Sequence, residues 1–378
     1  MKRNLIRILS VTVGILLLTV IVFGLSGDRS TAAHDNQAIA ATTDLGRGNI
    51  SNRAAETLSG PSTHSWTKES MLAAQPYPLE IVPNEPAVSL ELAKPSGAPG
   101  IIPGSPPEVG QRTTTFSEET LALSQATVTG YNYPPPFVRY QNFDSYLVYP
   151  YSTVGVLFFE QAGVPYWCTA ASIGNNGIWT AGHCIHKGDG KLDADGNVID
   201  QGTWSTKVLF VPAYPNGISA FGVWEAYELW ITPEWFTSQD LRYDMGGVVL
   251  NLKGGKTISQ VVGNLGFSYN MDNSLHWMNI AYPSAPPFDG STQQICAGSF
   301  AYADTSMPDP SPVAMGCDLT SGSSGGPWIL SFGGSTGSQN YLNGNNSYRY
   351  GSHPEELYSP YFDSDAKSLW NDLTGTTH

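Results

Sequence analysis

The sequence is poor in charged side chains, and basic ones are the scarcest. Only 13% of its 378 residues are charged, and 18 Lys and Arg stand against 32 Asp and Glu, giving a formal net charge of −14. Nucleic-acid binding needs basic side chains concentrated on one face, so we expect no nucleic-acid partner. In contrast, 40 Gly, 27 Pro, 10 Trp and 19 Tyr are typical of turn-rich strands. The composition therefore favours an all-β protein.

Cysteine is also rare, and its four copies all lie in the second half of the chain, at Cys168, Cys184, Cys296 and Cys317. No Cys-x-x-Cys pair is present, which speaks against a zinc site, and we expect no metal. In an oxidising compartment four cysteines permit three disulfide pairings. We predict the two pairs that are local in sequence, Cys168 with Cys184 and Cys296 with Cys317. Each would contribute roughly 3 kcal/mol by closing a short loop.

Long apolar runs are missing, with one exception at the N-terminus. Three basic residues among the first seven precede an apolar run from Ile8 to Leu25, the order of an export signal. The run approaches the roughly 20 residues that span a bilayer, but small residues near Ser26 and Ala33 offer cleavage points. We therefore predict that residues 1–33 are a signal peptide rather than an N-terminal membrane anchor. The protein would be secreted, and would contact a membrane only if this run is retained.

Sustained apolar periodicity is absent between residues 34 and 139, where ten prolines fall between Pro61 and Pro107. Such a segment is not expected to form a large core of its own. It is either a pro-segment removed on maturation or a flexible linker, and we favour the pro-segment because exported chains are often processed. Residues 140–378 would then be the folded catalytic unit.

Short apolar runs separated by turn residues recur after about residue 140, which is the spacing of strands in a sandwich or barrel. The expected strands lie near residues 154–159, 167–173, 177–181, 208–211, 223–231, 245–252 and 328–332. A helical pattern occurs only at the end, where Asp363 or Ser364 can cap a segment containing Leu369 and Leu373. The sequence thus predicts a β-structure closed by one helix.

The strongest local signal is the run Gly322-Ser323-Ser324-Gly325-Gly326-Pro327. Glycines around a serine let backbone N–H groups converge on one point, as an oxyanion hole requires. We predict that Ser324 is a nucleophile and that the amides of Gly322 and Ser324 form the oxyanion hole. A flexible Gly/Ser loop would explain the same residues without chemistry.

A serine hydroxyl needs a base, and the run Thr180-Ala181-Gly182-His183-Cys184 supplies one. A strand that ends in small residues would deliver His183 to a turn, which Cys184 could fix to the preceding strand through Cys168. His186 lacks this bracketing, and a metal site built from His183 and His186 has no evident third ligand.

The base needs a carboxylate to orient it, and Asp244 fits best. It opens Asp244-Met245-Gly246-Gly247-Val248-Val249-Leu250, so that a buried strand follows it at once. Asp240 is the competitor, but its polar neighbours indicate a solvated role.

These three motifs resemble those of the chymotrypsin-like serine peptidases, in particular their secreted bacterial and fungal branch related to glutamyl endopeptidases. The resemblance extends from Tyr149 to about Tyr350 and includes the order His, Asp, Ser. It implies an all-β fold of two packed six-stranded Greek-key β-barrels with the triad between them. It also implies a serine endopeptidase, acting as a monomer on proteins or peptides without a cofactor.

Two departures from the family concern activation and specificity. Many animal members carry Asp just before the nucleophile, where it pairs with a freed N-terminal amine, whereas this chain has Ser323. In glutamyl-specific relatives a His precedes the Ser of the pocket strand, and here Asn346 precedes Ser347. Asp318, six residues before Ser324, has the spacing of the carboxylate that selects Lys or Arg, but the neighbouring Cys is displaced, so Asp318 could instead be structural. The substrate pocket is therefore expected at Asp318, Asn346 and Ser347, with its preferred side chain open.

Two other readings use the same residues. Gly322 to Gly326 also satisfies the Gly-x-Ser-x-Gly elbow of esterases, but a strand rather than a helix is expected after it, and only His353 and His378 follow. The other alternative is a catalytically silent relative that serves in binding. All three motifs are intact, which argues against it. The acidic run 189–197 could coordinate calcium, but it lacks the Glu that ends the usual calcium-binding loop. A solvent-exposed hairpin turn explains the same residues.

Overall fold

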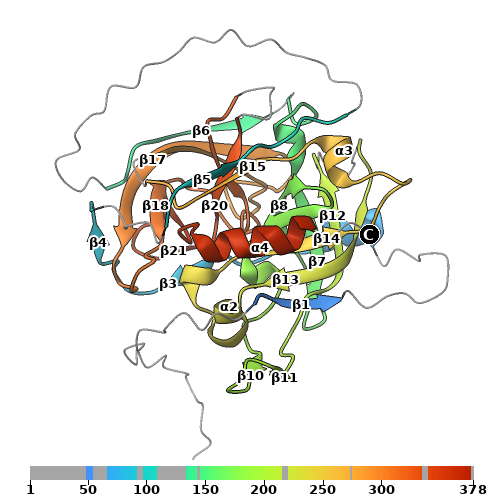
Figure 1. Ribbon diagram of the computed structural model, residues 1–378. Helices are drawn as coiled ribbons and strands as arrows, with labels where there is room; N and C mark the ends of the chain where they lie inside the picture. Colours follow the sequence, from blue (N-terminus) through green and yellow to red (C-terminus); the bar gives the residue numbers. More distant parts are fainter. Residues whose placement is uncertain are drawn as a thin grey trace, which may run out of the picture. The chain divides into compact units, whose positions relative to one another are not determined.

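A computed structural model describes residues 48–53, 66–91, 97–108, 133–142, 145–214, 220–272, 275–333 and 339–375. Its first sheet contains a closed ring in the order β7-β8-β9-β14-β13-β12, because β13 also pairs with β14 (Figure 1). These strands are β7 (Val154–Gln161), β8 (Val164–Gly174), β9 (Gly177–Thr180), β12 (Thr206–Pro212), β13 (Trp224–Ile231) and β14 (Gly246–Leu250). The ring is a six-stranded barrel, and the apolar runs in this part of the sequence predicted its strands.

Strand β7 shows why these residues close a barrel. Its side chains alternate between two apolar clusters, as the twofold period of a strand requires. Leu157 and Phe159 pack with Ile178 inside the barrel, whereas Val156 and Phe158 face a second cluster that includes side chains of the other sheet. Burial on both faces fixes the register of β7 and joins the two sheets through one core.

The second sheet has twelve strands in the structure. Eight of them follow the first barrel: β15 (Gly266–Tyr269), β16 (His276–Ala281), β17 (Gln293–Asp304), β18 (Val313–Gly316), β19 (Pro327–Leu330), β20 (Tyr341–Asn345), β21 (Tyr348–Tyr350) and β22 (Glu356–Ser359). The other four come from before residue 143. The eight later strands alone exceed the six expected for a second barrel, and the four earlier strands enlarge the sheet further. The all-β fold class predicted from the sequence is confirmed.

The segment expected to be a pro-segment contributes strands to both sheets in its described parts. Strands β1 (Ile50–Arg53) and β2 (Gln75–Pro76) pair with β13 and β8 of the first sheet. Strands β3 (Glu80–Val82), β4 (Val88–Ser89), β5 (Gly100–Ile102) and β6 (Phe137–Asn142) join the second sheet. The boundary expected at residue 140 lies inside β6, which pairs with β17 along its whole length.

Helices are short and peripheral: α1 (Lys68–Ala73), α2 (Pro233–Ser238), α3 (Ile258–Val262) and α4 (Ser364–Gly375). The predicted C-terminal helix is confirmed as α4, whose first turn is capped by Asp363, since its carboxylate accepts from the backbone N–H groups of Asp365 and Ala366. Leu369 and Leu373 of α4 are fully buried. Among the described residues no helix is long and apolar enough to cross a membrane, and the N-terminal run 1–33 lies outside them.

The acidic run 189–197 belongs to a small hairpin formed by β10 (Lys191–Leu192) and β11 (Val198–Asp200), drawn below the barrel in Figure 1. The carboxylate of Asp193 accepts from the backbone N–H groups of Asp195 and Asn197 and from the Asn197 amide. Turn chemistry therefore accounts for these residues, as the sequence indicated.

Candidate active site

His183 and Asp244 meet at the ends of two neighbouring strands. Strands β9 and β14 run antiparallel with Thr180 opposite Gly246, so the turn after β9 and the residues before β14 lie at the same end of the barrel. His183 sits in a short 3-10 turn, Gly182–Cys184, and Asp244 follows another, Leu241–Tyr243. The pairing of two buried strands thus brings the two side chains together.

The carboxylate of Asp244 is fully buried and accepts three hydrogen bonds. One oxygen accepts from the backbone N–H of His183 at 2.8 Å, and the other lies 2.8 Å from His183 Nδ1. The Ser347 hydroxyl donates to the same second oxygen at 2.5 Å. A buried carboxylate needs such donors, and with Nδ1–H given to Asp244, the other ring nitrogen, Nε2, is left as a proton acceptor.

The competing carboxylate, Asp240, lies elsewhere. It caps the turn before Asp244 and forms an ion pair with Arg242, with 2.6 Å between the carboxylate and the guanidinium. Asp240 is thus engaged in a structural contact, and of the two candidates only Asp244 is hydrogen-bonded to His183.

The serine loop requires glycine at two positions where the backbone has positive φ. Gly325 has φ of +78°, and a Cβ there would lie 2.0 Å from the Thr180 hydroxyl. Gly322 has φ of +89°, and its Cβ would lie 2.7 Å from the indole nitrogen of Trp167. The loop therefore packs tightly against β8 and β9, which a flexible Gly/Ser linker would not do.

Strand β8 holds the serine loop and the histidine turn with two consecutive residues. Cys168 forms a disulfide with Cys184, next to His183. Thr169 donates its backbone N–H to the Ser324 carbonyl at 2.8 Å and its hydroxyl to the Gly322 carbonyl at 3.0 Å. Ser324 and His183 come from different sheets, and β8 fixes both.

The two atoms expected to react lack hydrogen-bond partners among the described residues. Neither the Ser324 hydroxyl nor His183 Nε2 is hydrogen-bonded, so the structure joins His183 to Asp244 but not Ser324 to His183. Ser324 has no exposed surface, and His183 is 6% exposed. The candidate nucleophile and the candidate base are therefore shielded from solvent.

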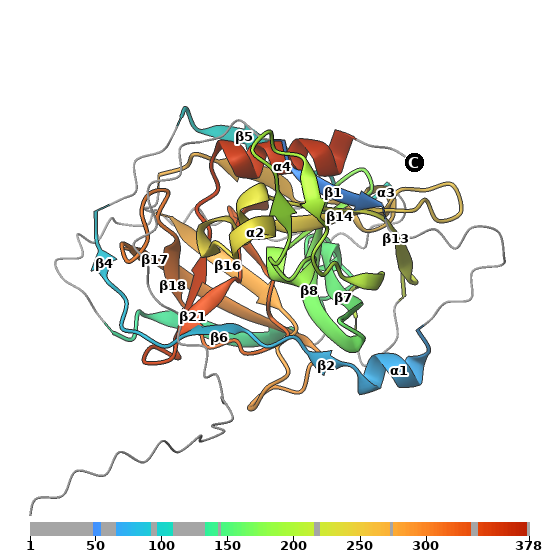
Figure 2. The ribbon, with the colours of Figure 1, turned by 90° about the horizontal axis from the view of Figure 1, so that it is seen from below.

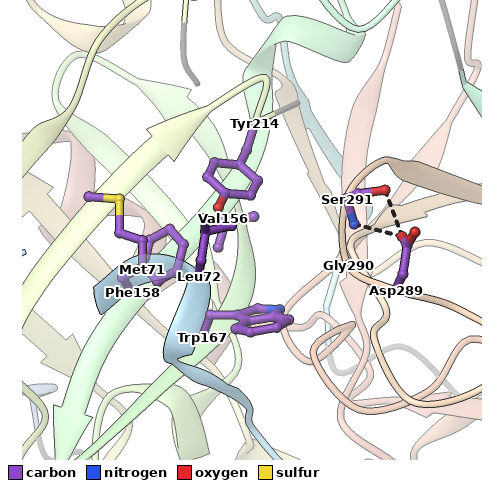
Figure 3. Close-up of a pocket in the computed structure, with 9 residues that line it drawn as sticks. All are labelled: Met71, Leu72, Val156, Phe158, Trp167, Tyr214, Asp289, Gly290 and Ser291. Atoms are coloured by element: carbon purple, nitrogen blue, oxygen red, sulfur yellow. Dashed lines mark hydrogen bonds between the residues drawn. The ribbon is translucent and has the colours of Figure 1, made fainter. Parts of the chain in front are cut away.

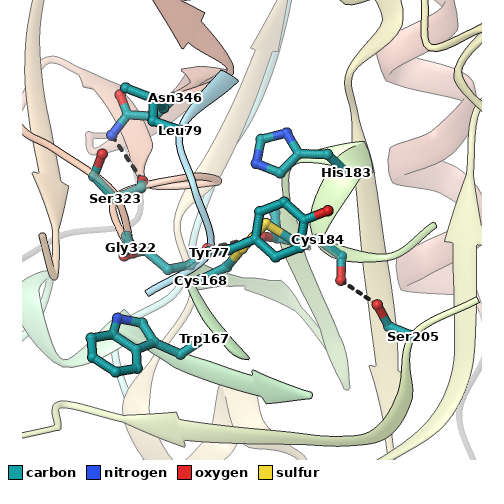
Figure 4. The surroundings of a disulfide bond; sticks show 12 residues. Tyr77, Leu79, Trp167, Cys168, His183, Cys184, Ser205, Gly322, Ser323 and Asn346 are labelled. Atoms are coloured by element: carbon teal, nitrogen blue, oxygen red, sulfur yellow. Dashed lines mark hydrogen bonds between the residues drawn. A yellow bond between two sulfur atoms is a disulfide. The ribbon is translucent and has the colours of Figure 1, made fainter. Parts of the chain in front are cut away.

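Both disulfides chosen from the sequence are formed, Cys168–Cys184 and Cys296–Cys317. Figure 4 shows the first of them beside His183 and the serine loop. Cys168, Cys184 and His183 are close enough to hold a metal ion, but the two sulfur atoms are already bonded to each other. This cluster is consequently a disulfide beside the candidate base.

The three residues expected to line the substrate pocket have other partners. Asp318 forms an ion pair with Arg139, with 3.1 Å between the two side chains. The charge of Arg139 offsets the negative charge with which Asp318 would attract a Lys or Arg side chain of a substrate. The Asn346 amide donates to the carbonyl of Ser323 and accepts from the Trp328 indole, and so supports the serine loop from below. Ser347 is bonded to Asp244. Their role in selecting substrates stays a prediction.

His186 is a structural residue in the described chain. Its Nε2 bonds the carbonyl of Gln201 at 2.9 Å, and its Nδ1 accepts the backbone N–H of Gly188 at 2.8 Å. Burial lowers the pKa of His186. The side chain therefore holds the loop after His183 as a neutral ring.

Sequence reasoning missed Tyr77, which lies directly on the site. The backbone N–H of Gly322 donates to the Tyr77 carbonyl at 3.1 Å, and the phenol ring stacks on the His183 imidazole with 5.3 Å between ring centres (Figure 4). Burial raises the pKa of Tyr77. Only its position between Pro76 and Pro78 sets this residue apart in the sequence, and that is no functional signal.

An apolar pocket of about 160 Å³ lies beside Trp167, at the side where α1 covers the first barrel. Figure 3 shows Met71 and Leu72 of α1 on one wall with Phe158 and Trp167, and Asp289 hydrogen-bonded to Ser291 on the other side. None of the three triad candidates lines it.

Solved serine proteases resemble this chain. The thermostable serine protease AL20 from an extremophilic microorganism matches at 32% sequence identity with a TM-score of 0.52, covering 60% of this chain and 98% of that protease. The protease Anisep from Arthrobacter nicotinovorans matches at 32% identity with a TM-score of 0.52, covering 60% of this chain and 96% of Anisep. A Glu endopeptidase matches at 17% identity with a TM-score of 0.48, over 63% of this chain and 97% of that one. No family model and no curated protein matches the sequence.

Proposed function

The chain belongs to the chymotrypsin-like serine peptidases, and from this premise we propose that it is a secreted serine endopeptidase whose triad is His183, Asp244 and Ser324. The observation that carries the proposal is the contact between the buried Asp244 carboxylate and both the ring and the backbone of His183. A carboxylate held this way fixes the orientation and the tautomer of the imidazole, which is what a general base requires.

The chemistry follows from the roles of the three groups. His183 Nε2 takes the proton of the Ser324 hydroxyl as its oxygen attacks a peptide carbonyl, and Asp244 stabilises the imidazolium that results. The backbone N–H groups of Gly322 and Ser324 stabilise the negative charge on the carbonyl oxygen. His183 then protonates the leaving amine, and an acyl-enzyme remains on Ser324.

Water completes the reaction without a cofactor. His183, neutral again, takes a proton from water as it attacks the acyl-enzyme, and returns the proton to Ser324 as the acid product leaves. The substrates are proteins or peptides. The two disulfides support export, since such bonds persist in oxidising compartments. We propose that the enzyme acts as a monomer.

The direct test is covalent labelling of the secreted protein with a fluorophosphonate probe. We expect one label at Ser324, found by mass spectrometry, and none in the Ser324→Ala variant. A peptide library then separates a peptidase from an esterase. A folded protein that takes no label, even after removal of the segment before residue 137, would contradict the proposal and favour the silent binding relative.

Mass spectrometry of the labelled species also locates its N-terminus. This measurement tests the predicted signal peptide 1–33 and the predicted removal of a segment before about residue 140.

A further inference from the structure

The segment Gln75–Val82 crosses the candidate site and pairs with both sheets. At one end β2 lies parallel to β8, with Pro76 opposite Trp167. At the other end β3 lies parallel to β21, with Ile81 opposite Arg349. Strand β8 fixes the serine loop and the histidine turn, and β21 directly follows Ser347. An extended stretch of this chain therefore runs from the first sheet to the second, and Figure 2 shows the chain leaving α1 and passing through β2 toward β4.

Tyr77, at the centre of the segment, engages the groups that would act on a substrate. Its carbonyl accepts from the Gly322 N–H at 3.1 Å, and this N–H is one of the two proposed oxyanion donors. Its own N–H donates to the Trp167 carbonyl at 2.8 Å. Its ring covers the face of His183, and its hydroxyl donates to Gln161, which in turn donates to the His183 carbonyl. Tyr77 thus contacts both the oxyanion donor and the base.

Leu79 holds the segment down on the other side of the serine loop. It is 5% exposed and belongs to an apolar cluster that includes Cys317 and Leu319, the residues leading into that loop. Its backbone N–H donates to the Ser321 hydroxyl at 3.3 Å. Ile81, two residues further on, is 51% exposed and points away from the cluster. On this side of the serine loop the segment therefore buries Leu79 and leaves Ile81 exposed.

The residues before Gln75 anchor the segment to the first barrel. Trp66 and Met71 are buried in the same core cluster as Phe158, and the Trp66 indole donates to the Lys207 carbonyl at 2.7 Å. The anchor brings Gln75 to β8 and raises the local concentration of the segment at the site.

We propose that Gln75–Val82 is an inhibitor built into the chain, which binds the site as an extended peptide and excludes substrates until it leaves. The full burial of Ser324 and the near burial of His183 are the expected state of a site filled in this way. The inference rests on the proposed function, because only a working triad needs to be blocked. Once the segment has left, the exposed surface would bind a substrate as an extended peptide. One substrate carbonyl would accept from the Gly322 N–H as that of Tyr77 does, and the residue two positions later would be apolar like Leu79.

The test compares labelling rates of three full-length chains, with intact N-termini verified by mass spectrometry. Leu79→Asp places a charge in the apolar cluster and should release the segment, so we expect fluorophosphonate to label Ser324 at least about tenfold faster than in the unaltered chain. Ile81→Asp is the matched control in the same segment, at an exposed position two residues further on, and it should label at the unaltered rate. Equal rates in all three chains would overturn the proposal.

Hydrogen exchange provides a second measurement that does not depend on activity. In a Ser324→Ala background, the amides of Tyr77 and Gly322 should exchange slowly, and Leu79→Asp should accelerate both while the barrel strands stay protected. Fast exchange of both amides in the unaltered segment would overturn the inference. Displacement of the segment without any labelling of Ser324 would instead contradict the proposed function and leave the binding of the segment in place.

Discussion

Ser347 has a hydrogen-bond partner that the sequence did not indicate. The sequence placed it in the substrate pocket, whereas in the structure its hydroxyl is bonded to the buried carboxylate of Asp244. It is one of three donors to that carboxylate, and a hydrogen bond to a charged group contributes roughly 1.5–3 kcal/mol. We therefore predict that Ser347 positions His183 through Asp244.

We predict that Ser347→Ala lowers kcat about tenfold and leaves KM nearly unchanged, because the lost bond orients Asp244 and His183 rather than the substrate. The measurement is steady-state kinetics on a peptide substrate with the processed enzyme. Ser323→Ala is the matched control. The Ser323 hydroxyl, next to Ser324 in the sequence, is also buried but has no hydrogen-bond partner in the described chain. A rise in KM alone would show that Ser347 contacts substrate instead.

His186 gives the stability a pH dependence whose sign follows from its lowered pKa. Burial is the main cause, opposed by the Gln201 carbonyl and by Asp189. The folded state takes up a proton less readily than the unfolded chain, since Nδ1 must accept the N–H of Gly188. The stabilising contribution is thus complete above the ordinary value of 6.5 and is lost as the pH falls through the lower, folded-state pKa.

We therefore expect the free energy of unfolding to fall between pH 7 and pH 5 more steeply in the unaltered protein than in His186→Gln. Urea unfolding at several pH values measures both slopes. Parallel curves for the two proteins would contradict this role of His186.

At the scale of elements, the disulfide Cys168–Cys184 joins strand β8 to the turn that carries His183. Both cysteines are fully buried, and they are 16 residues apart in sequence. We predict that the free energy of unfolding of the double variant Cys168→Ala, Cys184→Ala is lower by about 3 kcal/mol. Without the disulfide, the unfolded chain regains the conformational entropy that closing the loop removes. Urea unfolding of the variant measures the loss, and an unchanged midpoint would contradict it.

Elements with many apolar residues could be predicted from the sequence, and short ones could not. Strand β7 has eight residues, five of which alternate between two apolar clusters, and because both of its faces are buried it stands out in the sequence as a continuous apolar run. Strands β2 and β3 have two and three residues and are held mainly by backbone pairing. Nearly any residue can supply that pairing, so a proline-rich sequence hides it.

The candidate site divides along the same line. His183, Asp244 and Ser324 each stand in a run of consecutive residues whose local geometry is tightly constrained, and the sequence singled them out. Tyr77 and the actual partner of Ser347 depend on contacts between distant parts of the chain. Asp318 illustrates the limit, because its spacing from Ser324 indicated a pocket and only the fold revealed its ion pair with Arg139.

At the scale of the whole molecule, one structural feature links enzyme control to solubility. Strand β3 pairs with β21 in the described chain, so the backbone donors and acceptors on that side of β21 are used. Once β3 has left, β21 becomes an edge strand with an unpaired hydrogen-bonding row, the kind of surface on which sheets of separate molecules join. A short strand of only three residues limits this risk. In our proposal the segment over the site therefore has a second role, because it protects the chain from edge-to-edge aggregation for as long as it stays bound.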